Sequence, residues 1–126
     1  MQNNNIKILV VDDDVHIRRM MEFKLMKQGY QVILARNGEE GLELIKSQQP
    51  DVVITDLIMP KVDGKSLCEQ TNYLKKERPF LTIIVTARIS PDEKKWITEM
   101  HDTEFVTKPF SPTKLVKLVD QYFNRN

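Results

Sequence analysis

The stretch Ile-Leu-Val-Val-Asp-Asp-Asp, residues 8–14, determines the fold that we expect for this chain. A run of apolar residues from Ile6 to Val11 ends there in three consecutive aspartates. An apolar run without polar alternation is typical of a strand that is buried on both faces, as in a parallel sheet covered by helices. Acidic residues that directly follow such a strand lie at its carboxyl end, where open α/β sheets bind their ligands.

The same unit, a short apolar run followed by a longer amphipathic segment, occurs five times along the chain. Further strands are predicted at residues 30–35, 51–55, 81–86 and 104–107. The predicted fold is therefore α/β, a doubly wound five-stranded parallel sheet with five helices on its two faces. These units use residues 6 to about 124, so we expect one domain over residues 1–126 with a short disordered tail at residues 1–5. Helices are predicted to start at about Val15, after Asn37, after Gly64 (one helix that ends before Pro79), after Ser90 and after Ser111.

Several polar residues are predicted to have structural or solvent-exposed roles only. The sequence Ser90-Pro91-Asp92-Glu93 contains an N-cap serine, a proline at the first helical position and a capping-box glutamate. Cys68 lies on an apolar helix stripe and is expected to be a small buried hydrophobe. The remaining members of this group are two helix caps (Asp14, Asn37 with Glu40), two surface histidines (His16, His101) and two basic clusters expected to be solvated (Lys75-Lys76-Glu77-Arg78, Lys94-Lys95).

Composition excludes several classes of protein. The 126 residues include 19 Lys and Arg against 18 Asp and Glu, and this near balance argues against a general nucleic-acid binder and against an acidic disordered segment. Cys68 is the only cysteine, so no internal disulfide can form. No stretch approaches the roughly 18 apolar residues that a membrane span needs, and no apolar run follows Met1. We therefore expect a cytoplasmic protein without a membrane segment.

Charged and polar residues follow four of the predicted strands. Asp12 and Asp13 follow the first strand, Asp56 follows the third, Thr86 ends the fourth and Lys108 follows the fifth. Parallel topology brings these strand ends to one edge of the sheet. Two carboxylates ~4 Å apart repel by about 4 kcal/mol at an effective dielectric constant near 20, so the cluster should bind protons or a cation. Carboxylate oxygens in a site open to solvent favour Mg²⁺.

The chain resembles the receiver domains of two-component response regulators, the CheY-like family. This resemblance implies a (βα)5 fold like those of CheY and flavodoxin. It covers nearly the whole length, and four motifs in the correct order carry it: residues 8–14 at the first strand, residues 56–64 (Asp-Leu-Ile-Met-Pro-Lys-Val-Asp-Gly) after the third, Thr86-Ala87 at the fourth and Lys108-Pro109-Phe110 at the fifth.

The resemblance implies a role for each residue at the strand ends. Asp56 would be the phosphoryl acceptor. Asp13 and Asp56 would bind Mg²⁺ directly, and Asp12 would bind it mostly through water. The main-chain carbonyl of Ile58 would be a further ligand. Lys108 would pair with the acceptor carboxylate and then with the phosphoryl group.

The resemblance also implies a switch. The Thr86 hydroxyl and the Ala87 amide would contact the phosphoryl group, and the peptide bond between Lys108 and Pro109 would be cis. Movement of Thr86 toward the phosphoryl group would draw Phe105 inward and remodel the face formed by the helix after Ser90, the fifth strand and the last helix.

The same resemblance implies the partners. A sensor histidine kinase or a phosphotransfer protein would donate the phosphoryl group, and a downstream protein or an output domain would read the switch. We expect no direct contact with nucleic acid or membrane, and a homodimer that forms on phosphorylation is an open expectation. The chain would catalyse only its own phosphorylation and dephosphorylation. Ile58 and Arg88, each two residues after a site residue, are predicted to tune the phosphoryl lifetime.

Two other functions of this architecture fit the sequence poorly. A flavodoxin-like redox protein would have to bind a flavin phosphate beside three aspartates, which would repel it. A phosphatase of the aspartyl-phosphate type would have Asp-x-Asp where this chain has Asp56-Leu57-Ile58. Two alternatives stay open within the resemblance. One is an interaction module that works without phosphorylation, and the other is a receiver fragment of a larger DNA-binding regulator or hybrid kinase.

Overall fold

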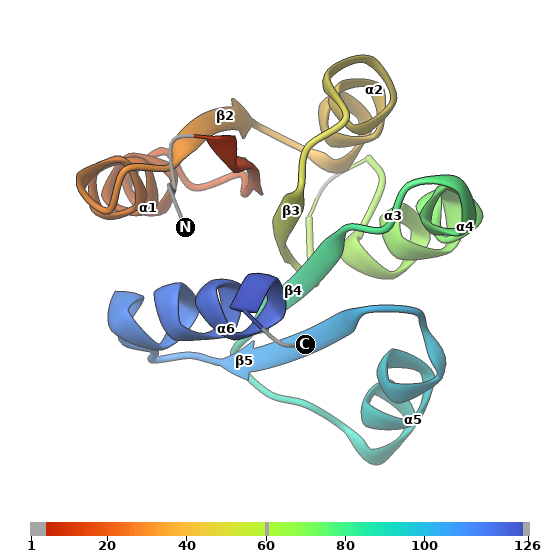
Figure 1. Cartoon of the computed structure of the whole chain (residues 1–126). Helices are drawn as coiled ribbons and strands as arrows, with labels where there is room; N and C mark the ends of the chain where they lie inside the picture. The colour runs from red at the N-terminus through yellow and green to blue at the C-terminus, as the bar shows by residue number, and fades with distance from the viewer. Residues whose placement is uncertain (1–4, 60, 125–126) are drawn as a thin grey trace.

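A computed structural model describes residues 5–59 and 61–124 of the chain. Its centre is a parallel sheet of five strands in the order β2-β1-β3-β4-β5 (Figure 1). The strand order reverses between β1 and β3, which is the point where doubly wound sheets bind ligands. The predicted doubly wound parallel sheet is thereby confirmed. The strands are β1 (Lys7–Val11), β2 (Gln31–Ala35), β3 (Val52–Asp56), β4 (Leu81–Thr86) and β5 (Thr103–Thr107).

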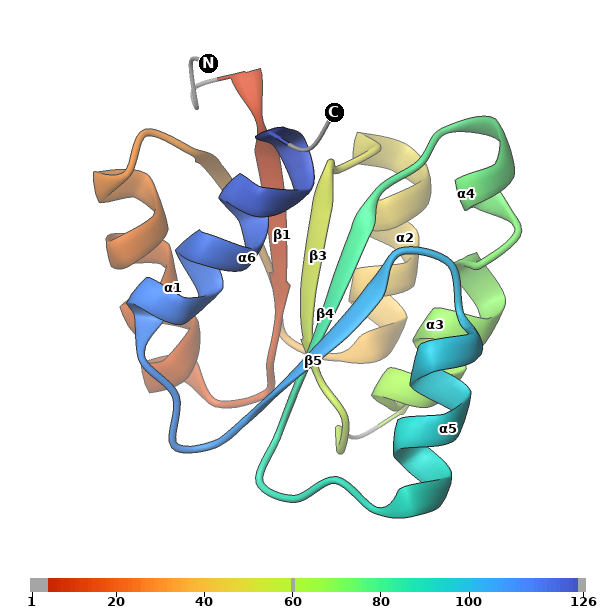
Figure 2. The ribbon, with the colours of Figure 1, turned by 60° about the horizontal axis from the view of Figure 1, so that its bottom comes forward.

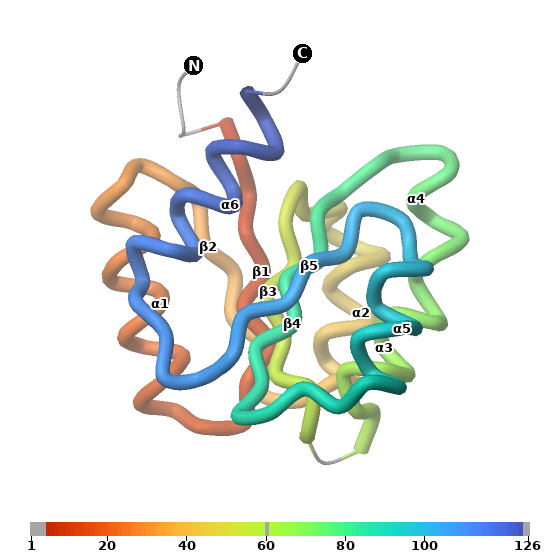
Figure 3. Tube along the Cα trace, turned by 90° about the horizontal axis from the view of Figure 1, so that it is seen from below, coloured from red at the N-terminus to blue at the C-terminus, as the bar shows by residue number. Residues whose placement is uncertain are grey.

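Helices cover both faces of the sheet. Helices α1 (Val15–Lys27) and α6 (Pro112–Asn124) lie on one face, and the other helices lie on the opposite face (Figures 2 and 3). Alternate residues of β1 divide accordingly. Ile8 and Val10 pack with α1 and α6, whereas Leu9 and Val11 pack with α2 and α3. The helices of the second layer are α2 (Gly38–Gln48), α3 (Gly64–Thr71), α4 (Leu74–Glu77) and α5 (Pro91–Glu99).

The helix count differs from the prediction, because the described residues contain six helices rather than five. The segment predicted as one helix, after Gly64 and before Pro79, begins at Gly64 and is interrupted at Asn72 and Tyr73, between α3 and α4. The Thr71 hydroxyl donates to the carbonyl of Leu67 at 2.8 Å. Hydroxyls that bond back to the preceding turn are known to bend helices. The short α4 that follows is anchored by its own side chains to other parts of the fold.

The prediction that residues 75–78 form a solvated cluster is wrong at Lys75. Lys75 is only 6% exposed, and its Nζ donates to the carbonyls of His101 at 2.6 Å and Asp102 at 3.1 Å and to the Thr103 hydroxyl at 3.2 Å. Arg78 forms an ion pair with Asp51 at 2.7 Å. Lys75 therefore joins α4 to the turn before β5, and Arg78, whose side chain stays 41% exposed, joins the residue after α4 to the turn before β3.

The predicted helix starts are confirmed in detail. The Asp14 side chain accepts the backbone N–H of His16 at 2.8 Å, and the Asn37 side chain accepts that of Glu40 at 2.9 Å. The capping box of α5 has both of its hydrogen bonds. Cys68 is buried as expected.

Some bounds differ slightly from the prediction. Asp56 is the last residue of β3 rather than the residue after it, β2 begins at Gln31 and β5 begins at Thr103. In the predicted disordered tail, residues 1–4 lie outside the described residues, and Asn5 is exposed. Among the described residues, no helix combines the length and the apolar character needed to cross a membrane.

Candidate functional site

Three carboxylates lie together at the carboxyl edge of the sheet. β1 and β3 are paired, with Val11 opposite Thr55, so Asp12 and Asp56 follow as neighbours. Asp12, Asp13 and Asp56 each offer an oxygen, and these oxygens lie within 4.8 Å of one another. Asp12 is buried, Asp56 is half-buried and Asp13 is exposed. The convergence expected from the parallel topology is therefore present.

Asp12 is held at several of its polar atoms. One carboxylate oxygen of Asp12 accepts a hydrogen bond from the backbone N–H of Asp14 at 2.9 Å. The backbone N–H of Asp12 donates to the carbonyl of Ala35 at 3.2 Å. Its carbonyl accepts a hydrogen bond from Arg18 Nη1 at 2.7 Å. Burial raises the pKa of the Asp12 carboxyl above its ordinary value, and repulsion from Asp56 adds to this. The site therefore favours a bound positive charge.

Lys108 supplies one such charge. Its Nζ donates to Asp56 Oδ2 at 3.0 Å, and its backbone N–H donates to the Thr86 carbonyl at 2.7 Å, which joins the ends of β4 and β5. Burial lowers the pKa of Lys108, but the hydrogen bond to Asp56 and the attraction of the nearby aspartates outweigh burial and leave that pKa raised. The peptide bond from Lys108 to Pro109 is cis, as expected.

A hollow beside Asp56 gathers most of the other predicted site residues. Thr86, Ala87, Arg88, Ile58 and Lys108 line it together with Asp56. The Thr86 hydroxyl donates to the carbonyl of Arg88 at 3.0 Å, so it is engaged at the rim of this hollow. The side chain of Ile58 is 79% exposed, whereas its backbone N–H donates to Asp56 Oδ1 at 3.2 Å.

The donor set fits a magnesium ion. Mg²⁺ binds oxygen ligands at about 2.0–2.1 Å and usually takes one or two carboxylates while it keeps several waters. The three carboxylates of this site offer hard oxygen ligands at one solvent-accessible point. Asp13 and Asp56 are the better exposed pair, and buried Asp12 lies behind them. The backbone of Ile58 also lies beside Asp56.

Comparison with known proteins identifies the family. The profile of the response regulator receiver domain matches residues 8–120. The chain belongs to this family. Among curated proteins, a probable transcriptional regulator ycf27 of Cyanophora paradoxa is 39% identical over 115 residues, which cover 91% of this chain and 47% of that protein. The alkaline phosphatase synthesis transcriptional regulatory protein PhoP of Bacillus subtilis is 35% identical over 122 residues, which cover 97% of this chain and 50% of PhoP.

Solved structures agree with this assignment. The chemotaxis response regulator CheY4 of Vibrio cholerae matches with a TM-score of 0.83 and 29% identity, and the match covers 92% of this chain and 97% of CheY4. A putative response regulator from Chloroflexus aurantiacus matches with a TM-score of 0.83 and 32% identity, over 95% of this chain and 98% of that chain. The receiver domain spans about half the length of the curated relatives that it matches.

One predicted switch residue lies apart from the hollow. Phe105 of the receiver domain is half-buried in β5, opposite Ile84 in the sheet register. It packs against a cluster that includes Ile84, Ile97 and Leu57. The structure therefore joins Phe105 to the layer that carries α5, and its predicted movement stays a prediction.

Prediction from the sequence missed two residues around the site. Glu93 lines the hollow beside Asp56, where its side chain accepts the N–H of Ser90 at 2.9 Å. The capping-box pattern identified Glu93, but only as a helix cap. Arg18 donates to the backbone carbonyl of Asp12, and no local sequence pattern indicates such a contact.

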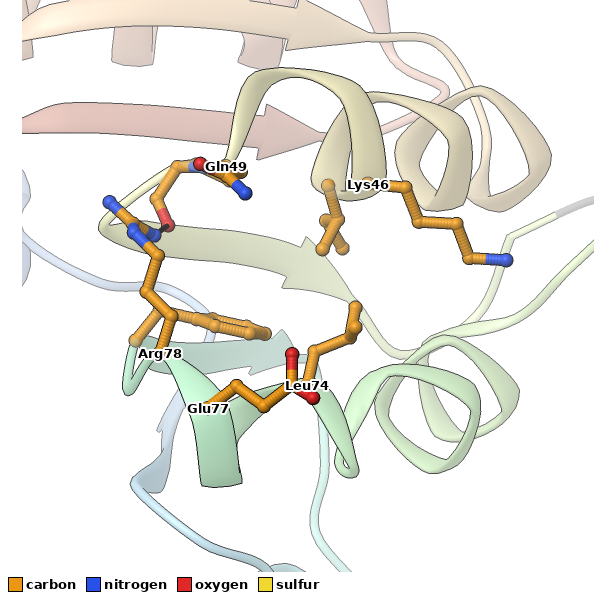
Figure 4. Close-up of a pocket in the computed structure, with 8 residues that line it drawn as sticks. Lys46, Gln49, Leu74, Glu77 and Arg78 are labelled. Atoms are coloured by element: carbon orange, nitrogen blue, oxygen red, sulfur yellow. Dashed lines mark hydrogen bonds between the residues drawn. The ribbon is translucent and has the colours of Figure 1, made fainter.

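A second hollow lies at the opposite end of the receiver domain, beside the amino ends of β3 and β4. Lys46, Gln49, Leu74, Glu77 and Arg78 surround it, between the end of α2 and α4 (Figure 4). Its floor includes the buried side chains of Ile45 and Phe80. None of the predicted site residues lines this hollow, so the candidate site is at the carboxyl edge.

Proposed function

We propose that this receiver domain accepts a phosphoryl group on Asp56 from a sensor histidine kinase or a phosphotransfer protein. The observation that carries the proposal is the setting of the Asp56 carboxylate. It borders an open hollow, pairs with Lys108 at 3.0 Å and lies beside Asp12 and Asp13. Membership of the response regulator receiver family supports the same assignment.

The reaction needs one nucleophile. A carboxylate oxygen of Asp56 attacks the phosphorus atom of the donor, a new P–O bond forms, and the bond from phosphorus to the leaving group breaks with its electrons on that group. Phosphoryl transfer depends mainly on alignment of the groups and on cations beside the phosphoryl oxygens. Lys108 is one such cation, and the amide of Ala87 and the hydroxyl of Thr86 lie at the rim of the same hollow. The product is an acyl phosphate on Asp56.

The carboxylates would hold Mg²⁺. Asp13 and Asp56 would bind it directly, Asp12 would act through water, and the main-chain carbonyl of Ile58 would be a further ligand. The bound ion would supply positive charge against the phosphoryl oxygens. The pKa of Asp12 is raised mainly by burial and further by repulsion from Asp56, and the pKa of Lys108 is raised by the nearby aspartates against the effect of burial, so added positive charge would be favourable here.

The output would be conformational. A phosphoryl group in the hollow competes with the Arg88 carbonyl for the Thr86 hydroxyl, which is now 3.0 Å from that carbonyl. Phe105 would follow and change the surface made by α5, β5 and α6. To move a two-state equilibrium from 1:99 to 99:1 requires about 5.5 kcal/mol, which a few charge-assisted hydrogen bonds can supply. A downstream protein, an output domain or a second phosphorylated copy would read this surface.

The test is phosphorylation with a small donor. The full chain is incubated with acetyl phosphate and Mg²⁺ and examined by intact mass spectrometry. We expect the parent protein to gain one phosphoryl group and Asp56→Asn to gain none. Asp14→Asn is the matched control, because Asp14 is a nearby carboxylate whose capping role Asn also fills. A parent protein without the added mass would refute the proposal and favour an interaction module that works without phosphorylation.

Regulation of transcription is a further proposal about a longer protein. The ycf27 and PhoP relatives are named as transcriptional regulators, and this chain covers about half of each. A receiver within such a regulator would pass its conformational change to another domain. Within this chain, the proposed catalysis extends only to its own phosphorylation and dephosphorylation.

A further inference from the structure

Arg18 connects the first helix to the carboxylate cluster. It lies in the first turns of α1, is half-buried, and its Nη1 donates to the carbonyl of Asp12 at 2.7 Å. A hydrogen bond from a guanidinium is charge-assisted, and such bonds are shorter and stronger than neutral ones. The contact therefore holds the segment between β1 and α1 at the residue where the acidic cluster begins.

The position of this hydrogen bond matters for Asp13. The Asp12 carbonyl belongs to the peptide unit that joins Asp12 to Asp13, and a peptide unit is planar. A hydrogen bond that holds the Asp12 carbonyl oxygen therefore also holds the orientation of the backbone at the nitrogen of Asp13. The neighbouring groups are held separately, since the N–H of Asp12 bonds to Ala35 and the N–H of Asp14 bonds to the Asp12 carboxylate. Arg18 is thus the contact that orients the peptide before the exposed ligand.

We propose that Arg18 is a positioning residue for the cation site. It orients the Asp12–Asp13 peptide so that Asp13 faces the carboxylates of Asp12 and Asp56 before a cation arrives. The proposal rests on the proposed Mg²⁺ site. Groups that orient metal ligands typically change metal affinity about 10–100-fold when they are removed.

Charge and geometry give opposite expectations for this residue. A guanidinium repels Mg²⁺, so the loss of its charge alone would tighten binding. The loss of its hydrogen bond frees the peptide, and binding must then order it again, which weakens affinity. The direction of the change in Kd therefore separates the two roles. Arg19 offers a matched control, because it is the adjacent arginine and is exposed.

The experiment is calorimetric titration of the full chain with MgCl₂ alone. Arg18→Met removes the charge and the hydrogen-bonding group but keeps an unbranched stem, Arg18→Lys keeps the charge, and Arg19→Met removes a neighbouring charge. We expect Arg18→Met to raise the Kd for Mg²⁺ at least about tenfold, and Arg18→Lys to raise it less. Arg19→Met should stay within about twofold of the parent, since it removes charge without a site contact. Thermal unfolding without Mg²⁺ measures any separate effect on stability.

The possible failures are distinguishable. An Arg18→Met protein that binds Mg²⁺ as tightly as the parent, or more tightly, overturns the positioning role and leaves the proposed function intact. A parent protein that binds no Mg²⁺ refutes the metal site and this proposal with it. If Arg18→Met does not fold, Arg18→Lys decides, because an unchanged Kd in that variant also overturns the proposal.

Discussion

The buried ammonium of Lys75 should give the stability of this domain an unusual dependence on pH. Lys75 is 6% exposed, and its Nζ makes three hydrogen bonds to residues 101–103, in the turn before β5 and at its first residue. It also lies 4.8 Å from the ring centroid of Phe80. Burial lowers the pKa of Lys75 from 10.5 to about 8. The perturbation that tests this is Lys75→Met, which keeps an unbranched apolar chain and removes the titrating group.

The sign and size of the effect follow from proton linkage. Between pH 8 and 10.5 the unfolded chain keeps a proton on Lys75 that the folded chain has released. Stability rises with pH wherever the unfolded state binds more protons. The slope for one proton is about 1.4 kcal/mol per pH unit, so the free energy of unfolding should gain about 3 kcal/mol across this window. Below pH 8 both states are protonated and the contribution of Lys75 is constant.

The assay is urea unfolding of the parent and Lys75→Met at intervals from pH 7 to pH 10. The informative quantity is the difference between the two free energies of unfolding at each pH. We expect this difference to shift in favour of the parent as pH rises above 8. Burial also raises the pKa of Cys68 to about 12, against an attraction to Lys75 that lowers it, so in both proteins folded Cys68 stays protonated over the assayed range and adds a similar opposite trend. Lys76→Met is the control, because Lys76 is the exposed neighbour and should leave the slope unchanged.

A flat difference between pH 7 and pH 10 would refute the reasoning. It would mean that the three hydrogen bonds to the Lys75 ammonium offset the effect of burial on its pKa, so that Lys75 stays protonated in the fold from pH 7 to pH 10. A difference that shifts against the parent would show that the ammonium is more stable in the fold than in water.

Two further predictions concern the candidate site. A Cβ added at Gly64 would lie 2.5 Å from the carbonyl oxygen of Asp56 and 2.8 Å from Leu57 Cα, so Gly64→Ala should lower the free energy of unfolding by about 1–3 kcal/mol in urea titrations and slow phosphorylation. If the free energy of unfolding and the phosphorylation rate are both unchanged, the backbone of Asp56 and Leu57 can shift to accommodate the added methyl group at little cost. The branched side chain of Ile58 borders the same hollow, so Ile58→Asn should speed loss of the phosphoryl group in a mass-spectrometric time course, and slower loss would contradict the shielding role.

Much of the fold was predictable because the signals are local or periodic. Apolar runs placed the strands to within a residue, and serine, aspartate and asparagine caps placed the helix starts, as at Ser90. The site followed from topology. Because neighbouring parallel strands end at the same edge of the sheet, Asp12 and Asp56 lie close together although they are 44 residues apart in sequence. Their carboxylate oxygens converge as expected.

The missed features depend on distant backbone atoms. Lys75 stands beside Lys76 in a stretch that is typical of a solvated surface, yet its acceptors are carbonyls of residues 101 and 102 in the turn before β5. No local pattern encodes such acceptors. The break between α3 and α4 has a local contact beside it, the bond from the Thr71 hydroxyl to the Leu67 carbonyl, but the sequence does not show which acceptor a threonine hydroxyl will use. The role of Arg18 was not predicted because every residue has a backbone carbonyl, so the sequence does not show which carbonyl accepts the hydrogen bond.

The placement of the start of β1 and the end of α6 bears on any engineered sensor built from this domain. β1 begins and α6 ends at the pole of the molecule opposite the aspartate cluster (Figures 2 and 3). A fluorophore or partner module fused at either end would leave the approach to Asp56 free, so it should not obstruct a donor. The same placement means that such a reporter responds only if a conformational change at Asp56 extends across the domain to that pole. β5 and α6 are the elements that connect the region of Lys108 to that pole.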